Sequence, residues 1–378
     1  MKKFSLCFFV ATLSLGLLSA CDDDDNGGEI PESGYGDVSN IINTYVDVVV
    51  LQTYKDMKDE AWKLYEAVEA LNEENGWNTA NITAACAAWR ATRVPWEQSE
   101  SFLFGPAELQ NLDPLLDSWP LDKNGIDAVL NGGNFNPDAL GATVRGFHTV
   151  EYLLFEDGQP RSAGALLGED HLEYLMVVTE VLRDDCIKLW SSWAGEDALE
   201  GRDAEAMEEA EYSPQNYAFQ FKNAGKAGST YLSQDEAIDD IINGCMNIAS
   251  EVGAQKIGGP NGLAIAGNTE QAVLEVESWY SWNSITDYAN NIESIQNAYY
   301  GGRGLTTPGA NSLSAFVKNQ NAAMDTEITA AIKTAYDAIK TGMKQPFRNN
   351  LTGVEVNAAM NACAELEISI EKIKSLKK

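Results

Sequence analysis

Apolar residues recur every three or four positions along most of this 378-residue chain, which is the spacing of one helix face. Ile41, Tyr45 and Val48 begin such a run, and neither Pro nor Gly interrupts it before Leu71. A second run is bent or interrupted at Pro95, because proline lacks the N–H that a helix interior needs. The first half is therefore predicted to form four helices, at about residues 38–71, 79–104, 137–155 and 169–193.

The second half repeats this spacing after an acidic linker and a short helical patch near residues 214–223. Breaks that contain Gly or Pro separate its periodic segments. These segments predict four further helices, at about residues 233–256, 268–300, 310–341 and 353–377. The sequence lacks the alternation of apolar and polar residues that is typical of strands, so we expect an all-α fold of two four-helix bundles in tandem.

The chain is expected to divide where the helical periodicity stops. The predicted segments are a signal peptide at 1–20, a tether at 21–37, an N-terminal bundle at 38–195, a linker with a short helix at 196–232 and a C-terminal bundle at 233–378. Residues 105–135 are rich in Pro, Asp, Asn and Gly and read as a long ordered loop, which in a compact domain is usually functional. Residues 97–105 and 293–301 align without gaps, each ending in a Gly that stops a helix, which is compatible with an old duplication.

The N-terminal residues predict export and lipidation. Lys2 and Lys3 precede an apolar run that is too short to span a bilayer, for which about 20 residues are needed. The Leu-Ser-Ala-Cys sequence that ends at Cys21 resembles a bacterial lipobox, so cleavage would leave Cys21 to carry lipid chains. The four Asp residues that follow resemble the acidic tag of surface lipoproteins, and a solvated spacer is the alternative. We expect a bacterial outer-membrane lipoprotein that is exposed at the cell surface.

The charge and histidine counts exclude one class of partner and one class of site. Asp and Glu number 57 against 26 Lys and Arg, a formal charge of −31, so the chain would repel the phosphates of nucleic acid. Two histidines cannot build a zinc site of three imidazoles. Cys86, Cys186, Cys245 and Cys363 form no CxxC pair and are expected to be small buried side chains, with one disulfide left open as the alternative.

The segment with the sequence GFHTVE, from Gly146 to Glu151, carries the most informative chemistry. His148 and Glu151 are three residues apart and would project from one helix face, close enough to share a ligand. Tyr152 and Phe155 lie beside them, so this face should be covered, with the second bundle as the candidate. The pair would then form part of a metal site at the junction, and a hydrogen-bonded structural pair is the alternative.

Further charged and polar groups could complete this site. Arg93 reaches Glu97 and Glu100 at spacings of four and seven, and nearby positive charge keeps carboxylates ionised. These groups could ligate a cation or form a salt-bridge network. In the second half, an oxygen-rich stripe could oppose His148 across the interface or form a hydrogen-bonded seam between the halves. The stripe comprises Ser281, Asn283, Asp287 and Asn291.

Three motifs together resemble the imelysin-like family. They are WRATRVPWEQSESFLFGP at 89–106, LDPLLDSWPLD at 112–122 and GxHxxE at 146–151. The segment 281–301 also resembles the second-domain signature of that family, so the resemblance covers nearly all of the chain after the signal peptide. It implies two helical bundles with the GxHxxE site at their interface. It also implies an envelope protein linked to iron regulation or uptake, and one branch of the family is described as an insulin-cleaving metallopeptidase.

Carried over residue by residue, the resemblance implies that His148 and Glu151 are metal ligands. Glu97 and Glu100 are the further candidate ligands, and four other residues would line the site. These four are Arg90, Arg93, Trp119 and Asp122. Some relatives carry an additional His or Cys in the second-domain segment, and this chain has Trp282 and Ser284 there, which leaves a ligand role for that segment open.

We favour a binding protein that holds a divalent or ferric ion. Oxygen donors with one imidazole suit iron better than they suit a soft metal that prefers thiolates, and zinc is the other candidate. The ligand would be the metal or a metal chelate, acquired together with an unidentified envelope transport partner. The first alternative is a metallopeptidase, which needs three protein ligands, an open water position and a base, but the sequence contains no HExxH. The second alternative is a protein- or glycan-binding scaffold with a structural His/Glu pair.

Overall fold

The computed structural model describes residues 33–378, and this part of the chain is almost entirely helical. The all-α prediction is therefore confirmed. The lipobox-like sequence, Cys21 and the acidic tag lie outside the described residues. Over residues 33–378, no helix combines the length and the apolar character that crossing a membrane requires.

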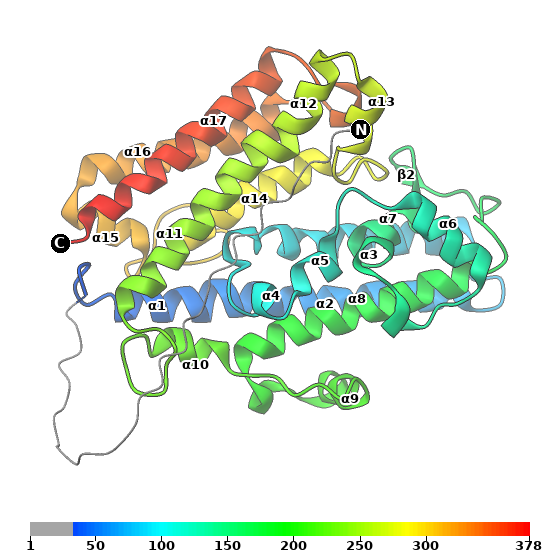
Figure 1. Cartoon of the computed structure of the whole chain (residues 1–378), viewed down its shortest axis with the longest axis horizontal. Helices are drawn as coiled ribbons and strands as arrows, with labels where there is room; N and C mark the ends of the chain where they lie inside the picture. The colour runs from blue at the N-terminus through cyan, green and yellow to red at the C-terminus, as the bar shows by residue number, and fades with distance from the viewer. Residues whose placement is uncertain (1–32) are drawn as a thin grey trace, which may run out of the picture.

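The first half is built around one long helix. α1 (Ser39–Thr44) continues through a π-helical segment (Tyr45–Val50) into α2 (Leu51–Asn72), as the uninterrupted periodicity predicts. The apolar stripe of α2 is buried and packs against α3 (Thr79–Glu97) and α8 (His171–Ala194). Pro95 lies inside α3 without ending it. In Figure 1, α2 and α8 run side by side along the lower part of the molecule.

The second half forms the upper part of the molecule in Figure 1. Its principal helices are α11 (Gln234–Glu251), α14 (Ser284–Tyr300), α16 (Ala322–Asp337) and α17 (Val354–Glu371), and their packing is compatible with a second bundle. α14 also packs against α3 of the first half. Residues of both halves belong to one continuous apolar core, so the seam between the halves is part of the protein interior.

Shorter elements connect these helices. In the first half they are 3₁₀ turn Glu100–Phe102, α4 (Pro106–Leu109), α5 (Leu112–Asp117), α6 (Lys123–Gly132), 3₁₀ turns Pro137–Ala139 and Ala142–Val144, α7 (Phe147–Leu154), β1 (Phe155–Glu156) and β2 (Gln159–Pro160). After α8 come 3₁₀ turn Glu196–Ala198, α9 (Gly201–Glu209) and α10 (Tyr217–Lys222). In the second half they are π-helical turn Val252–Ile257, α12 (Gly258–Ile265), α13 (Thr269–Leu274), α15 (Leu313–Gln320), π-helical turn Ala338–Gly342, 3₁₀ turn Phe347–Asn349 and 3₁₀ turn Lys372–Leu376.

Three predicted segments of the first half differ from the structure. The 105–135 loop contains α4, α5 and α6, because Pro106 can start a helix at its first position and Asp122 caps another by accepting the N–H of Gly125. The predicted helix 137–155 is helical only from Phe147, since Gly146 has φ +79° and breaks it. The acidic linker carries α9, whose apolar face is buried against Trp62.

The predicted helix 268–300 is two helices, and this difference matters for the site. α13 ends at Leu274 and α14 begins at Ser284, with an irregular segment between them. Two residues of this segment, Ser278 and Trp282, have positive φ angles of 53° and 58°. Since neither Ser nor Trp favours this conformation, the sequence carries no turn signal here. The break removes residues 275–283 from the helix and makes them available to the site.

The four cysteines behave as the sequence predicts. Cys86, Cys186, Cys245 and Cys363 are buried and free. Burial raises the pKa of the Cys86 and Cys245 thiols to about 12, so these groups stay protonated at neutral pH. They act as small apolar side chains of the core.

His171 is expected to limit the stability of the protein in acid. Its Nδ1 accepts the N–H of Leu167 at 3.0 Å, and burial, assisted by the charge of Arg161, lowers its pKa from 6.5 to about 4. Above pH 6.5 the folded and unfolded states both hold a neutral ring; between pH 6.5 and 4 only the unfolded state gains the proton, so stability falls. The loss should reach about 3 kcal/mol. His171→Asn keeps an acceptor oxygen but does not titrate. Between pH 6.5 and 4, its free energy of unfolding in urea should therefore fall by about 3 kcal/mol less than that of the wild type. An unchanged pH slope would contradict this assignment.

Candidate metal centre

Gly146 sets the distance between α7 and α5. A Cβ atom at this position would lie 2.4 Å from the backbone oxygen of Leu116, so only glycine lets the start of α7 approach this closely. The approach brings His148, in the first turn of α7, next to Asp117, the last residue of α5. The glycine of the GxHxxE motif therefore has a structural reason in this chain: it places the histidine against a carboxylate from another helix.

Replacing Gly146 with alanine should both destabilise the protein and disturb the site. The φ of +79° is unfavourable for alanine, and the added methyl group overlaps backbone that cannot move aside cheaply, so we expect a loss of about 2–4 kcal/mol. Gly141→Ala is the matched control, because no atom lies within 4 Å of a Cβ there and its φ is −66°. Thermal unfolding of the two variants measures the difference. Equal stability of both variants would show that the close approach is not required.

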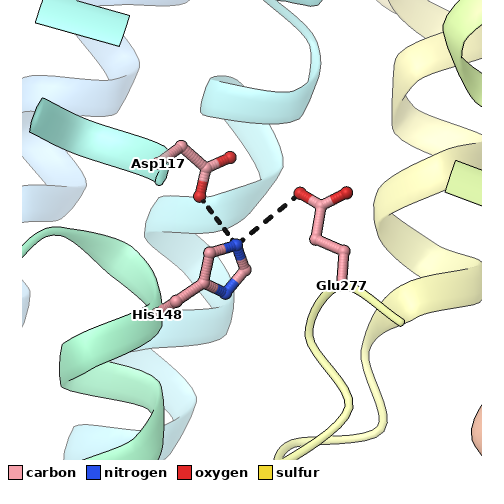
Figure 2. Close-up of side chains that lie close together, drawn as sticks. All are labelled: Asp117, His148 and Glu277. Carbon is pink, nitrogen blue, oxygen red and sulfur yellow. Dashed lines mark ion pairs between the residues drawn. The ribbon is translucent and has the colours of Figure 1, made fainter. Parts of the chain in front are cut away.

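Two carboxylates converge on one ring nitrogen of His148. The Nε2 atom lies 3.0 Å from Oδ1 of Asp117 and 3.7 Å from Oε1 of Glu277, and the three atoms all lie within 4.8 Å of one another. Figure 2 shows that Asp117 and Glu277 approach the nitrogen from different elements, one from α5 and one from the segment before α14. Nε2 is buried, and neither of its two carboxylate contacts has the geometry of a hydrogen bond.

The other ring nitrogen of His148 is held by Glu151. The Nδ1 atom lies 3.0 Å from Oε2 of Glu151, while Oε1 of the same carboxylate accepts hydrogen bonds from the backbone N–H and the hydroxyl of Ser281 at 2.8 and 2.7 Å. Such a carboxylate fixes the orientation and the tautomer of a ligating histidine. The HxxE spacing thus predicts the contact between these residues, but the geometry places Glu151 behind the imidazole instead of beside it at the converging point.

Arg93 joins the carboxylates from both halves of the chain. Its guanidinium is completely buried and forms ion pairs with Asp117, Glu97, Glu277 and Asp287, the last two at 3.0 and 3.4 Å. Because Asp117 comes from the first half and Glu277 from the second, this one cation holds the ligand candidates of the two halves together.

Lys256 supplies a second buried cation. Its ammonium lies 3.1 Å from Oε2 of Glu277 and 3.6 Å from Oε1 of Glu100. It projects from the π-helical turn Val252–Ile257, an irregularity that is frequent at functional sites because it changes the direction of side chains along a helix. Glu277 therefore uses one oxygen toward His148 and the other toward Lys256.

The buried cluster has more carboxylates than cations. Arg93, Lys256 and His148 together contact six of them, namely Glu97, Glu100, Asp117, Glu151, Glu277 and Asp287. Burial raises the pKa of Glu97 and Glu100 well above the usual range, against the pull of the two cations. Burial likewise raises the pKa of Asp287 to about 6. Burial thus works against ionisation of these three carboxyl groups.

The two carboxylates beside Nε2 have lowered pKa values. Burial opposes this, but the Lys256 ammonium, the neighbouring His148 ring and the Arg93 guanidinium hold the pKa of Glu277 down at about 2. Arg93 and His148 likewise hold the pKa of Asp117 below its usual range against the effect of burial. A metal ion binds the ionised form of a carboxylate, which Asp117 and Glu277 favour. Against the effect of burial, the same carboxylates raise the pKa of His148 well above its usual value, so the imidazole has to release a proton to the solvent when it ligates a metal ion.

All but one of the remaining predicted site residues contact the buried cluster or the residues around it. Arg90 donates to Oδ1 of Asn283 at 3.0 Å and to the backbone oxygen of Ser281 at 2.8 Å, and Asn291 donates to Glu97. These contacts cross between the halves, as a hydrogen-bonded seam would. The ring of Trp119 lies 4.6 Å from that of His148. Asp122 is exposed and caps α6, so the structure does not bring it to the site.

Three residues of the cluster were not among the predicted site residues. They are Asp117, Lys256 and Glu277. Asp117 stands within the LDPLLDSWPLD motif, so the motif was a signal for it. The position of Glu277 depends on the helix break before α14, and that of Lys256 depends on a π-helical turn. The sequence offers no signal for either feature.

The donor set fits a metal ion by its geometry. A four-coordinate ion with bonds of about 2.1 Å separates its ligand atoms by about 3.4 Å, close to the contacts of Nε2 with the two carboxylate oxygens. One imidazole with two carboxylates is the kind of set that iron, manganese and zinc accept. Glu97 and Glu100 lie in the same network, but Arg93 and Lys256 are their ion-pair partners.

Comparison with known proteins gives a consistent result along the chain. The model of the imelysin (peptidase M75) family matches residues 50–373. Iron-regulated protein A of Synechococcus elongatus is 27% identical over 336 residues, which cover 88% of this chain and 84% of that protein.

Solved structures give the same fold. A crystal structure assigned as an iron-regulated protein A precursor from Parabacteroides distasonis is 37% identical, with a TM-score of 0.83 over 93% of this chain and 97% of that one. An imelysin-like protein from Psychrobacter arcticum shares the fold alone, with a TM-score of 0.58 at 13% identity over 90% of this chain and 92% of its own.

Proposed function

The chain belongs to the imelysin family, and from that premise we propose that it binds a metal ion, with iron favoured, through Asp117, His148 and Glu277. The observation that carries the proposal is the convergence of two ionised carboxylates on a buried imidazole nitrogen that makes no aligned hydrogen bond. Glu151 and Ser281 would orient the imidazole from behind, and Arg93 would hold the two carboxylates in place. A bound cation would lie against the two carboxylates whose pKa values are held low.

Iron is favoured on two grounds. Oxygen donors with one imidazole suit iron or manganese, whereas a thiolate metal would need cysteine, and the four cysteines of the described chain are buried as free thiols. Two of the relatives reported above carry the name iron-regulated protein A. We infer a role in iron acquisition, together with an envelope transport partner whose identity the sequence does not give.

Binding is a better account of this geometry than peptide hydrolysis. A hydrolytic zinc site needs a base beside the metal-bound water. Two carboxylates of the cluster that are not proposed ligands are engaged: Glu151 contacts His148 and Ser281, and Glu97 pairs with Arg93 and accepts from Asn291. Exposed aromatic rings in residues 105–135 would favour the protein- or glycan-binding scaffold. In the structure, however, Trp119 packs on His148 and Phe135 is buried.

The protein is also proposed to be a lipoprotein of the outer membrane, anchored through Cys21 and exposed at the surface. The Leu-Ser-Ala-Cys sequence and the acidic residues after it support this. Mass spectrometry of the N-terminal peptide should find diacylglycerol on Cys21, and Cys21→Ala should release the protein from the membrane fraction. An unmodified Cys21 in membrane-bound protein would contradict the anchor.

Metal analysis of the purified protein tests the binding proposal. After incubation with equal concentrations of Fe²⁺, Mn²⁺ and Zn²⁺ and removal of free ions, elemental analysis should find about one ion per chain, as expected for one three-residue site. Asp117→Asn should lose that ion, because an amide is a weaker ligand than a carboxylate. Asp127→Asn is the control, since Asp127 is exposed and pairs only with Lys123. Equal metal content in Asp117→Asn and the wild type would remove the basis of the proposal.

A further inference from the structure

Two adjoining cavities, both open to solvent, lie beside the metal centre. The outer one has a volume of about 530 Å³ and the inner one about 280 Å³, and they share Glu100, Leu103, Asp113 and Glu251 in their walls. Asp117 and Glu277 line the inner cavity, so it reaches two of the three proposed ligands. We call the two cavities together the acidic cleft.

The walls of the acidic cleft carry charge of almost one sign. The acidic residues of the outer cavity are Glu100, Glu108, Asp113, Asp240 and Glu251. Those of the inner cavity are Glu100, Asp113, Asp117, Glu251, Glu275 and Glu277. Lys256, at the inner end, is the single cationic side chain that lines either cavity in the described chain. A cleft with low-dielectric walls and charge of one sign concentrates ions of the opposite sign and raises their association rate.

Glu100 gives a second reason to expect a cation in the cleft. Its side chain is 9% exposed and lines both cavities, yet it accepts no hydrogen bond from any described residue. Its ion-pair partner Lys256 stands 3.6 Å away, which is longer than a charge-assisted hydrogen bond. The Glu100 carboxyl therefore faces both cavities with one distant cation beside it, and a cation in the cleft would be a second partner.

We propose that the acidic cleft admits free or hydrated multivalent cations to the metal centre and excludes anionic metal chelates. The proposal rests on the function proposed above and names the form in which the metal arrives. A chelate such as ferric citrate carries carboxylates of its own, which the cleft walls repel. The inner cavity is also at the small end of the range for sites that bind organic ligands, about 300–1,000 Å³. The same reasoning excludes haem, whose propionates are negatively charged and whose ring is larger than a hydrated ion.

The association rate of Mn²⁺ tests the role of the cleft. Mn²⁺ quenching of tryptophan fluorescence can be followed by stopped flow, with Trp119→Phe identifying the signal from the site. The cleft variant is Glu108→Gln, Asp240→Asn and Glu251→Gln together, none of which contacts His148. It should bind Mn²⁺ about 10-fold more slowly at low salt with unchanged stoichiometry, and its rate should depend less on salt. The control variant is Glu73→Gln, Glu74→Gln and Glu365→Gln, which removes the same charge from exposed sites elsewhere and should leave the rate unchanged.

The outcomes separate this inference from the proposed function. The cleft proposal is overturned if the wild-type association rate is independent of salt, or if the cleft and control variants bind at equal rates. The proposed function still stands in that case if Mn²⁺ binds to the wild type and binding is lost in His148→Ala. The wild-type salt dependence needs no variant, so it decides the question even where the cleft variant fails to fold. Equilibrium dialysis with ¹⁴C-labelled ferric citrate supplies the second arm: iron retained without citrate is expected, and citrate retained with the iron overturns exclusion. A wild type that binds no cation overturns both proposals.

Discussion

Replacing His148 with alanine is expected to lower metal affinity by about 100-fold or more, because loss of a mere supporting residue already costs about 10–100-fold. The residue is the one imidazole at the site, and the two carboxylates that face it are held in place by Arg93 and Lys256, so they cannot replace the missing ligand. Isothermal titration with Mn²⁺ or Fe²⁺ measures the effect. His171→Asn is the matched control, since His171 is the other histidine of the chain and lies outside the cluster, and it should bind as the wild type does.

Glu151→Gln separates the two roles that this residue could have. If Glu151 orients His148, as its contact with Nδ1 indicates, the variant should bind about 10-fold more weakly, in the range of second-sphere substitutions. A loss as large as that of His148→Ala would instead make Glu151 a ligand, which is what the HxxE spacing predicts. Unchanged affinity in His148→Ala itself would contradict the site.

Replacing Arg93 with methionine is expected to cause the largest loss of stability, about 3–5 kcal/mol at neutral pH, as for other buried ion pairs from which one partner is removed. The four carboxylates that Arg93 contacts would then face one another in the protein interior. The loss should be smaller in acid, because protonation removes the repulsion between these carboxylates. A divalent cation should also restore more stability to this variant than to the wild type, since it replaces the missing charge.

Chemical unfolding at pH 5 and pH 8, with and without Mn²⁺, measures these effects. Arg202→Met is the control: its side chain is 50% exposed and pairs with Glu66 at the surface, so it should lose less than about 1 kcal/mol. If Arg93→Met were as stable as the control at pH 8, the carboxylates would have to be neutral in the native state. The repulsion between carboxylates that Arg93 is expected to relieve would then be absent.

The sequence was a good guide to the helices and a partial guide to the site. Periodicity placed the long helices because their apolar faces pack against one another whatever the details of the loops. The stop at Gly301 was also predictable, and the structure gives this glycine a φ of 70°. By contrast, Ser278 and Trp282, between the end of α13 and the start of α14, have a backbone conformation that neither residue prefers. Tertiary contacts therefore determine this break between the helices. One such contact is the ring of Trp282, which covers Gly158 so closely that a Cβ there would lie 2.2 Å from it.

The site was predicted from one side. The HxxE spacing identified His148 and its contact with Glu151, and charge spacing on α3 identified Arg93 and Glu97 as partners. What the helical spacing could not give was the pairing across the seam, because Asp117 and Glu277 meet His148 only after the chain has folded. The spacing of residues along one helix predicts which of them lie close together, but it does not predict contacts between residues of three separate segments.

Anomalous diffraction from a crystal soaked in Mn²⁺ or Fe²⁺ locates the bound ion and its ligands. We expect one strong peak about 2.0–2.2 Å from Nε2 of His148 and from a carboxylate oxygen of both Asp117 and Glu277. Glu151 should remain on the Nδ1 side of the ring, without a bond to the ion. A peak that is bound by Glu151 and not by Glu277, or one that lies away from His148, would contradict the proposed site.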